Sequence, residues 1–213
     1  MTTLLLIRHG ESLANRECFF AGQLDVPLEP RGLEQAHCTA SFIDTHYSVD
    51  KIYASDLRRA YDTAAAISQP LDTEIVTDSR LREIYAGSWQ GEAFDRIVAR
   101  YAADYGVWLT DIGNCICTQG ESLSQLSRRV CRALEDIALE NPGKTVAVAT
   151  HATPIRAAQC LLGGHPLGEM KDIPWVSNAS VTELFYEKGA WQFGKISQDE
   201  HLAHMRTAFG ANV

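Results

Sequence analysis

The sequence predicts an α/β fold, in which a mainly parallel central sheet lies between two layers of helices. Two aliphatic runs, residues 4–7 and 145–149, are typical of short strands that are buried on both faces. Segments with the apolar spacing of helices alternate with these and other short strands, and such alternation favours parallel pairing. Because the chain has 213 residues, of which 46% are hydrophobic, we expect a single three-layer domain over residues 1–213.

The first strand leads into a loop and a helix. Residues 15–29 are polar and aromatic, and we expect them to form a loop long enough to line a site. A helix begins at Pro30, and His37 lies on its apolar stripe, so we expect this histidine to be at least partly covered. The other members of the stripe are Leu33, Ala36, Ala40 and Ile43.

A second strand–helix unit follows. Residues 51–54 form a short strand, and Ser55 and Asp56 stand where a helix cap belongs. The helix places Arg58 and Arg59 in its first turn, at a switch from strand to helix. Its buried face is predicted to consist of Ala60, Ala64 and Ile67.

The middle of the chain gives weaker signals. Residues 73–77 are a third strand, and the glycines between residues 81 and 91 indicate turns. Residues 92–108 are predicted to be helical, whereas residues 109–120 give no clear prediction. One side of the helix would carry Phe94, Ile97, Val98 and Tyr101.

The C-terminal part is clearer. Ser122 and Gln125 form a capping box for an amphipathic helix that ends at residues 141–143. The strand 145–149 then runs into His151, and Pro154 starts another helix. Residues 181–186 and 191–196, separated by Lys188 and Gly189, are typical of an antiparallel hairpin.

Composition excludes several partners. The formal net charge of −8 and the lack of a basic stripe argue against nucleic acid and acidic membranes, and no apolar run approaches the length of a membrane span. The six cysteines lack the spacing of a zinc site, so we expect reduced, mostly buried thiols. Because Met1 leads directly into the first strand, without room for a signal peptide, we expect a cytoplasmic protein.

Cations and imidazoles follow the strands. Arg8 and His9 end the first strand, Arg59 follows the second, and His151 ends the strand 145–149. Ligands of open α/β sheets bind at the carboxyl ends of the strands, where these side chains would meet. Glu83 stands in the adjoining turn-rich segment. Together they predict an anion site, and we expect the anion to be a phosphoryl group.

The residue types suit phosphoryl transfer. Arginines bind the nonbridging oxygens, and a neutral imidazole can attack phosphorus to give a phosphoenzyme. The cationic neighbours Arg8 and Arg59 would keep His9 neutral. Glu83 is the candidate acid for the leaving group, because a nearby dianion favours its protonated form.

Five ordered segments of this chain resemble the histidine phosphatase superfamily, in its phosphoglycerate-mutase-like branch. Residues 8–12 (Arg-His-Gly-Glu-Ser) with Asn15 resemble its signature, and residues 55–60 resemble the segment of its second phosphate-binding arginine. The others are residues 81–83 with Gly87, Trp89 and Gly91, residues 120–122, and residues 150–151.

The resemblance implies the roles of individual residues. His9 would be the phosphorylated nucleophile and Glu83 the acid and base. The phosphoryl group would be bound by Arg8, Arg59 and His151, with contacts from Asn15 and Gly22. The resemblance implies no metal and no cofactor. The chain departs from the family pattern at Ala152, where glycine is usual, and at Ile84, where the family's mutases carry arginine.

Three functions are weighed. We expect a phosphomonoester hydrolase of the histidine acid phosphatase type that acts on a small phosphorylated metabolite. Residues 84–120 hold only Arg96 and Arg100 as cations, but Tyr85, Trp89, Tyr101, Tyr105 and Trp108 as aromatics, so we expect an uncharged or aromatic leaving group. A cofactor-dependent phosphoglycerate mutase is the runner-up. A noncatalytic module that binds phosphorylated ligands ranks low, because nucleophile and acid are both present. The oligomeric state stays open, with a homodimer as one option.

Other polar residues have plainer explanations. Any single aromatic residue of this segment is best explained by the core, Arg58 by solvent or a nearby acid, and Glu121 by a favourable charge at a helix N-terminus. The histidines at positions 46, 165, 201 and 204 lack a motif and are expected at the surface.

Overall fold

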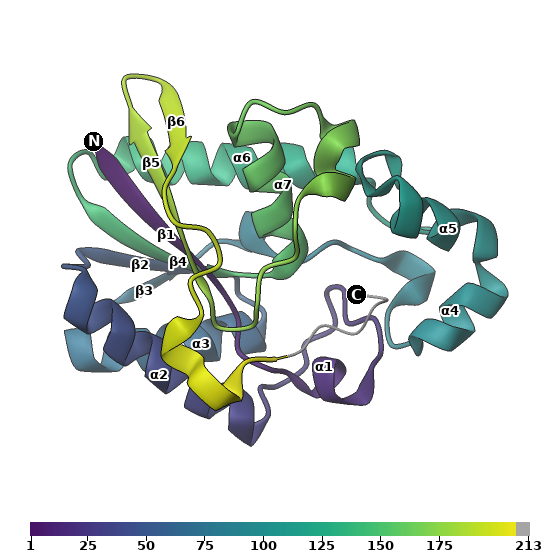
Figure 1. The fold of residues 1–213 in the computed structure, drawn as a ribbon, viewed down its shortest axis with the longest axis horizontal. Helices are drawn as coiled ribbons and strands as arrows, with labels where there is room; N and C mark the ends of the chain where they lie inside the picture. Colours follow the sequence, from purple (N-terminus) through teal and green to yellow (C-terminus); the bar gives the residue numbers. More distant parts are fainter. Residues whose placement is uncertain (208–213) are drawn as a thin grey trace.

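A twisted six-stranded sheet passes through the centre of the protein in a computed structural model that describes residues 1–207 (Figure 1). The strand order is β3-β2-β4-β1-β5-β6. The first four strands of that order are parallel, whereas β5 pairs antiparallel with β1 and β6 antiparallel with β5. The strands are β1 (Thr2–Arg8), β2 (Lys51–Ala54), β3 (Ile75–Thr77), β4 (Thr145–Thr150), β5 (Val181–Glu187) and β6 (Ala190–Phe193). The predicted α/β fold with a mainly parallel sheet is confirmed.

Helices cover both faces of the sheet. On one face, α2 and α3 pack against Leu5 and Ile7 of β1, and on the other face α6 and α7 pack against Leu4 and Leu6 (Figure 1). The alternation of side chains along β1 therefore divides the core into two halves. The helices are α1 (Leu13–Glu17), α2 (Pro30–His46), α3 (Arg58–Leu71), α4 (Phe94–Arg100), α5 (Ala102–Thr110), α6 (Leu123–Glu140) and α7 (Ala152–Leu162).

Short 3₁₀ turns connect several of these elements. They are η1 (Ser79–Leu81), η2 (Gly87–Trp89), η3 (Ile112–Asn114), η4 (Leu167–Asp172) and η5 (Glu200–Met205). The first two form the turn-rich segment that was predicted around Glu83.

The register of β1 and β4 brings their ends together. Arg8 lies opposite Thr150, and the backbone N–H of His9 donates to the carbonyl of Thr150 at 3.0 Å. His9 and His151 therefore leave the sheet side by side, at the carboxyl end of two parallel neighbours.

The predicted face of α2 is correct at Ala36, Ala40 and Ile43, which are buried, and wrong at Leu33 and His37, which are exposed. The helix also buries Gly32, Gln35 and Thr39. These small or hydrogen-bonded residues allow the helix to approach the chain closely and shift the buried stripe to their side.

Some boundaries also differ from the predictions. The segment 15–29 overlaps a one-turn helix, α1, and β6 ends at Phe193. Helix α7 begins at Ala152, with Pro154 inside its first turn. The cap of α3 is Leu57, because Asp56 pairs with Arg82 instead of capping the helix.

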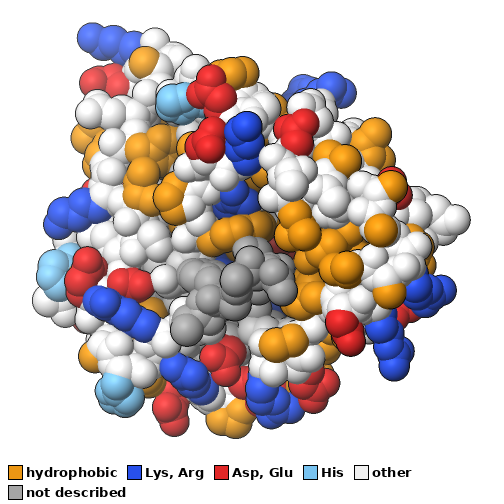
Figure 2. Space-filling model, turned by 45° about the vertical axis from the view of Figure 1, so that its right-hand side comes forward, with side chains coloured by type: hydrophobic (Ala, Val, Ile, Leu, Met, Phe, Trp, Pro, Cys, Tyr) orange, Lys and Arg blue, Asp and Glu red, His pale blue; other side chains and the backbone are white. Residues whose placement is uncertain are grey.

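The predicted helix over residues 92–108 is broken. Tyr101 has φ −129° and separates α4 from α5. Val98 faces solvent, whereas Ile97, Tyr105 and Trp108 are buried. Both helices lie beyond the end of the sheet, and Figure 2 shows hydrophobic side chains gathered on this side of the molecule.

The cysteines are all free thiols within the described residues. Cys115, Cys117 and Cys160 are buried, Cys38 and Cys131 are partly buried, and Cys18 is exposed, so half of them are fully buried. Between residues 1 and 207, no helix has both the length and the hydropathy that a membrane crossing requires.

Candidate active site

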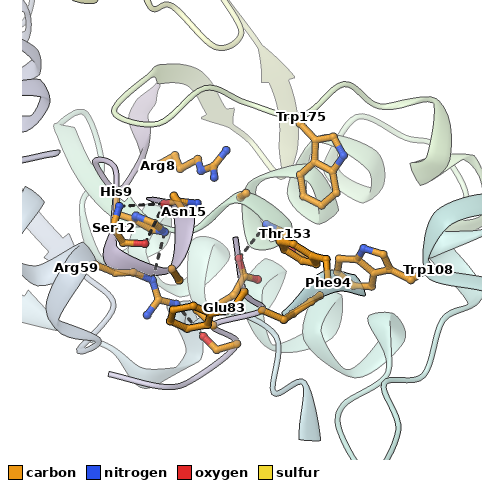
Figure 3. A pocket seen from close by; sticks show the side chains of 16 residues that line it. Arg8, His9, Ser12, Asn15, Arg59, Glu83, Phe94, Trp108, Thr153 and Trp175 are labelled. Carbon is orange, nitrogen blue, oxygen red and sulfur yellow. Dashed lines mark hydrogen bonds between the residues drawn. The ribbon is translucent and has the colours of Figure 1, made fainter. Parts of the chain in front are cut away.

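Two imidazoles lie against each other where β1 and β4 end. The ring centroids of His9 and His151 are 5.1 Å apart, with an interplanar angle of 63°. Both rings are buried, and His9 lines a pocket together with Arg8, Arg59 and Glu83 (Figure 3). Residues from distant parts of the sequence therefore meet at one edge of the sheet.

The contacts of His9 fix its tautomer. Arg59 Nε lies 3.3 Å from His9 Nε2, and because a guanidinium can only donate, Nε2 carries the lone pair. Nδ1 then carries the proton and donates to the carbonyl of Gly10 at 2.7 Å. Burial, reinforced by the charges of Arg59 and Arg8, holds the pKa of His9 well below 6.5. His9 therefore presents a neutral, nucleophilic nitrogen.

His151 is oriented by a serine. Ser55 Oγ lies 2.9 Å from His151 Nε2 and accepts the backbone N–H of Leu57 at 3.3 Å. If the serine hydroxyl donates to Nε2, the proton of the neutral ring stays on Nδ1, a buried atom that has no partner among the described residues. Burial first, and then the charge of Arg59, lowers the pKa of His151 well below 6.5. This arrangement leaves Nδ1–H as a donor for an anion.

Two buried guanidinium groups supply the positive charge. Arg59 donates to the carbonyls of Gly22 at 2.7 Å and Leu24 at 2.9 Å, which holds its side chain under the loop that precedes α2. Arg8 donates to the carbonyl of Val176 at 2.7 Å. The pKa of each arginine is lowered to about 10. Burial is the main cause, and the negative charge of Glu83 partly opposes it. Both groups therefore stay charged at neutral pH, and both line the pocket.

Glu83 lies between the cations and an apolar wall (Figure 3). Its Oε1 accepts the backbone N–H of Ile84 at 2.8 Å, and its Oε2 accepts the N–H of Thr153 at 3.4 Å. The second contact ties the carboxyl group to the first turn of α7, directly after His151.

The two predicted phosphate contacts also line the pocket. Asn15 Oδ1 accepts from the backbone N–H and the hydroxyl of Ser12 and, at 3.3 Å, from Asn178, so its amide NH₂ group remains available as a donor. Gly22 has φ +51°, and a Cβ there would collide with the side chain of Gln90. Its carbonyl is already used by Arg59, so only its N–H could meet an anion.

Aromatic side chains form the wall opposite the imidazoles. Phe94, Trp108 and Trp175 line this wall (Figure 3), and the rings of Trp108 and Trp175 have centroids 6.3 Å apart. The guanidinium of Arg156 lies 3.9 Å from the centroid of Trp175, behind the wall. The ring centroids of Phe20 and Trp108 are 5.2 Å apart, so Phe20 packs against the same aromatic wall.

Most of the aromatic residues named in segment 84–120 lie outside the pocket lining. Trp89 and Tyr105 are fully buried in the core, and Tyr85 is exposed away from the pocket. The core explanation therefore holds for Trp89 and Tyr105. Trp108 alone of that set reaches the pocket lining in the described part of the chain.

Several site residues escaped the sequence analysis. In the sequence Ser55 is identifiable only as a helix cap, and Trp175 and Thr153 belong to no motif. Asn178 is fully buried and donates to the carbonyl of His9 at 3.0 Å. Only Ser55, which directly follows a strand as His9 and His151 do, offered a signal that could have identified it.

The structure also places the polar residues for which we predicted no role in the site. Arg58 is exposed and pairs with Asp62 at 3.4 Å, as expected. Glu121 directly precedes the N-cap of α6, and its side chain pairs in addition with Arg129. His201 is wrongly predicted, because it is partly buried and stacks on Phe42 at 4.6 Å. The other three unassigned histidines are exposed.

The geometry suits the binding of a tetrahedral anion. Arg8, Arg59 and the imidazole of His9 line one end of the pocket, with the carboxyl group of Glu83 beside them. His151 is fully buried against His9 and is not one of the described residues that line the pocket. No cluster of three or more metal-ligating side chains occurs in residues 1–207. This donor set can neutralise a phosphoryl group and offer it a nitrogen nucleophile.

Comparison with known proteins agrees with this geometry. Phosphoserine phosphatase 1 of Hydrogenobacter thermophilus is 33% identical over 88% of both chains, and phosphoglycerate mutase-like protein 4 of Arabidopsis thaliana is 29% identical over 98% of this chain and 92% of its own. The solved structure of Bacillus stearothermophilus YhfR, 26% identical, superposes with a TM-score of 0.91 over 95% of this chain and all of that one. The model of the histidine phosphatase superfamily (branch 1) matches residues 4–199, and the chain belongs to this superfamily.

Proposed function

We propose that this protein is a phosphomonoester phosphatase that works through a phosphohistidine on His9. The observation that carries the proposal is the lone pair of His9 Nε2, directed by Arg59 and adjoining His151 at the buried end of the pocket. The class is that of a phosphomonoester hydrolase of the histidine acid phosphatase type, with a small-molecule substrate and no metal or cofactor.

In the first step His9 attacks the substrate. Arg8, Arg59, the Nδ1–H of His151 and the amide of Asn15 bind the nonbridging oxygens, with the N–H of Gly22 nearby. The Nε2–phosphorus bond forms while the bond from phosphorus to the leaving oxygen breaks, and Glu83 gives its proton to that oxygen. Neutral His9 thereby becomes a phosphoimidazole, and the product alcohol departs.

In the second step water regenerates the enzyme. Glu83, now a carboxylate, takes a proton from the attacking water, whose oxygen bonds to phosphorus as the Nε2–phosphorus bond breaks. Inorganic phosphate leaves, His9 recovers its lone pair, and Glu83 is again protonated. The same carboxyl group thus acts as acid and then as base.

The pocket lining favours a phosphatase over a mutase. Among the described lining residues the only cations are Arg8 and Arg59, both at the phosphoryl end, whereas Phe94, Trp108 and Trp175 form the opposite wall. A bisphosphorylated substrate would need a second set of cationic donors. Arg96 and Arg100 do not supply it, because they pair with Glu92 outside the pocket lining. We therefore assign an uncharged or aromatic leaving group.

The proposal extends to the compartment, the substrate class and the domain organisation. The free state of all six cysteines supports a reducing, cytoplasmic environment. A name such as phosphoserine phosphatase 1 supports a small phosphorylated metabolite as the substrate class. We treat residues 1–213 as one catalytic domain.

A substrate panel tests the proposal. The wild type should release phosphate from p-nitrophenyl phosphate faster than from phosphoserine, and it should interconvert phosphoglycerates far more slowly than either. His9→Ala should abolish turnover, while His37→Ala, which changes an exposed histidine of α2, should not. Mutase turnover equal to phosphatase turnover would reverse the ranking. Tight phosphate binding by a wild type that hydrolyses no monoester would instead indicate a binding module.

A further inference from the structure

One side chain outside the pocket holds the backbone of the segment that carries Glu83. Arg129, on α6, donates through Nη1 to the carbonyl of Arg80 at 2.8 Å and to that of Arg82 at 2.6 Å. Through Nη2 it donates to the carbonyl of Glu83 itself at 2.9 Å. The three acceptors span the end of η1 and the residue that bears the carboxyl group.

The remaining donors of Arg129 bind Glu121. Arg129 Nε lies 2.7 Å from Glu121 Oε1 and Arg129 Nη2 lies 2.8 Å from Glu121 Oε2, which is a bidentate ion pair. Glu121 in turn accepts the N–H of Tyr85 at 3.2 Å, and its own N–H donates to the carbonyl of Tyr85 at 2.7 Å. Arg129 and Glu121 therefore hold the chain on both sides of Glu83.

The position of this pair follows from the start of α6. Glu121 directly precedes the N-cap Ser122, and Arg129 lies two turns further along the helix, so both side chains reach the same segment. Both are mostly buried, with side-chain exposures of 20% for Arg129 and 13% for Glu121. Neither lines the active-site pocket. The pair can therefore reach the site only through the backbone that it holds or through charge, because Arg129 also helps to lower the pKa of His151.

We propose that Arg129, locked by Glu121, is the positioning residue for the proton donor Glu83. This inference rests on the proposed phosphatase reaction. Three hydrogen bonds from one planar group hold the backbone on which the carboxyl group stands, and two more bind Glu121. General acid catalysis requires the carboxyl group within hydrogen-bond reach of the leaving oxygen. Lysine keeps the charge but offers three donors without the fixed fork.

The test exploits the chemistry of the leaving group. The p-nitrophenolate ion leaves without protonation, whereas an alkoxide does not, so only alkyl phosphates depend strongly on the general acid. For Arg129→Lys we expect kcat/KM to fall about 10- to 100-fold with an alkyl phosphate such as phenethyl phosphate, and by less than about threefold with p-nitrophenyl phosphate. The quantity kcat/KM reports the phosphorylation step and excludes hydrolysis of the phosphoenzyme.

Matched variants separate positioning from general damage. Arg128→Lys changes the exposed neighbour on α6 and should leave both substrates unaffected. Glu121→Gln removes the negative charge of the ion pair and should cause the same selective loss of kcat/KM, but a smaller one. This variant tests the proposal if Arg129→Lys does not fold. In a Glu83→Gln background, Arg129→Lys should add no further selective loss, because the group it positions is absent.

The outcomes discriminate clearly. A selective loss with the alkyl phosphate that disappears in the Glu83→Gln background supports the positioning role. An equal loss with both substrates, or none, in a folded variant would overturn it while leaving the phosphatase proposal intact. A wild type inactive toward both monoesters would overturn the phosphatase proposal itself.

Discussion

At the residue scale, the state of His151 depends on the hydroxyl of Ser55. The serine accepts from Leu57 and lies 2.9 Å from His151 Nε2, so a serine hydroxyl that donates to Nε2 keeps the ring proton on Nδ1. Neither contact belongs to the proposed reaction itself. In the proposed mechanism they decide which nitrogen of the second imidazole is the donor to the phosphoryl oxygens.

Replacing Ser55 should weaken phosphate binding without unfolding the protein. Ser55→Ala removes a hydrogen bond of about 1 kcal/mol, so the inhibition constant of inorganic phosphate should rise about fivefold. Competitive inhibition of p-nitrophenyl phosphate hydrolysis provides the measurement, with the exposed Ser124→Ala as the control. An unchanged inhibition constant in Ser55→Ala would show that the serine does not set the tautomer.

The sequence identifies those residues of the site that stand at strand ends. Arg8, His9 and His151 follow buried aliphatic runs, so their meeting could be predicted from the topology of a parallel sheet. Trp175, which lines the pocket, and Asn178, which binds the carbonyl of His9, could not be predicted, because they lie in a segment without periodicity and reach the site only through the tertiary fold. Arg129 looks like any arginine of an amphipathic helix.

At the element scale, the loop after His9 depends on a close approach to α2. A Cβ on Gly10 would overlap the carbonyl oxygen of Gly32, and a Cβ on Gly32 would overlap the carbonyl of Glu11. The backbone of the first turn of α2 therefore packs directly against the backbone of residues 10–11. This contact supports the segment that carries the nucleophile.

Two glycine-to-alanine substitutions in helices should have opposite effects. Gly32→Ala should cost about 2 kcal/mol of unfolding free energy, because the new methyl group displaces α2. Gly106→Ala in α5, where a Cβ meets nothing within 4 Å, should stabilise by about 0.5–1 kcal/mol through helix propensity. Urea unfolding measures both. Equal effects of the two substitutions would contradict the close approach.

Elements with long, regular patterns were predictable, and short or interrupted ones were not. Helix α6 has a capping box and a sustained apolar stripe, and both appear in the structure. Helix α1 is a single turn, too short for a periodic signal. The break at Tyr101 is invisible in the sequence because Phe94 and Ile97 continue to fit one helical face.

At the scale of the whole molecule, an acidic chain surrounds a buried cationic site. The formal net charge is −8, yet Arg8 and Arg59 lie buried beside two neutral imidazoles. A fold that keeps His9 and His151 neutral must lose stability when acid protonates the unfolded chain.

This linkage predicts the acid sensitivity of the protein. The pKa of His9 and of His151 lies well below 6.5 in the folded state, so the unfolded chain binds more protons as the pH falls below about 6.5. Each such histidine should remove up to about 1.4 kcal/mol of stability per pH unit there. The lowered pKa of Asp56 and Asp78 acts only as the pH falls through about 3.8, outside this window.

Urea unfolding at pH 7.5, 6.5 and 5.5 measures this slope. His201, whose pKa burial also lowers, adds to the slope of the wild type. The decisive comparison is therefore His9→Asn, whose stability should fall by about 1.4 kcal/mol less than that of the wild type between pH 7.5 and 5.5. An identical slope in the two proteins would mean that His9 is protonated in the folded state.

The central claim is that His9 carries the phosphoryl group during turnover. In Glu83→Gln, p-nitrophenyl phosphate should still phosphorylate the enzyme, while hydrolysis of the intermediate lacks its base. Quenching this reaction in alkali and mapping the peptides by mass spectrometry should place one phosphoryl group on His9, in an acid-labile linkage, and none in a His9→Ala variant. A phosphoryl group on another residue, or release of phosphate by a wild type that never forms a phosphoenzyme, would contradict the account.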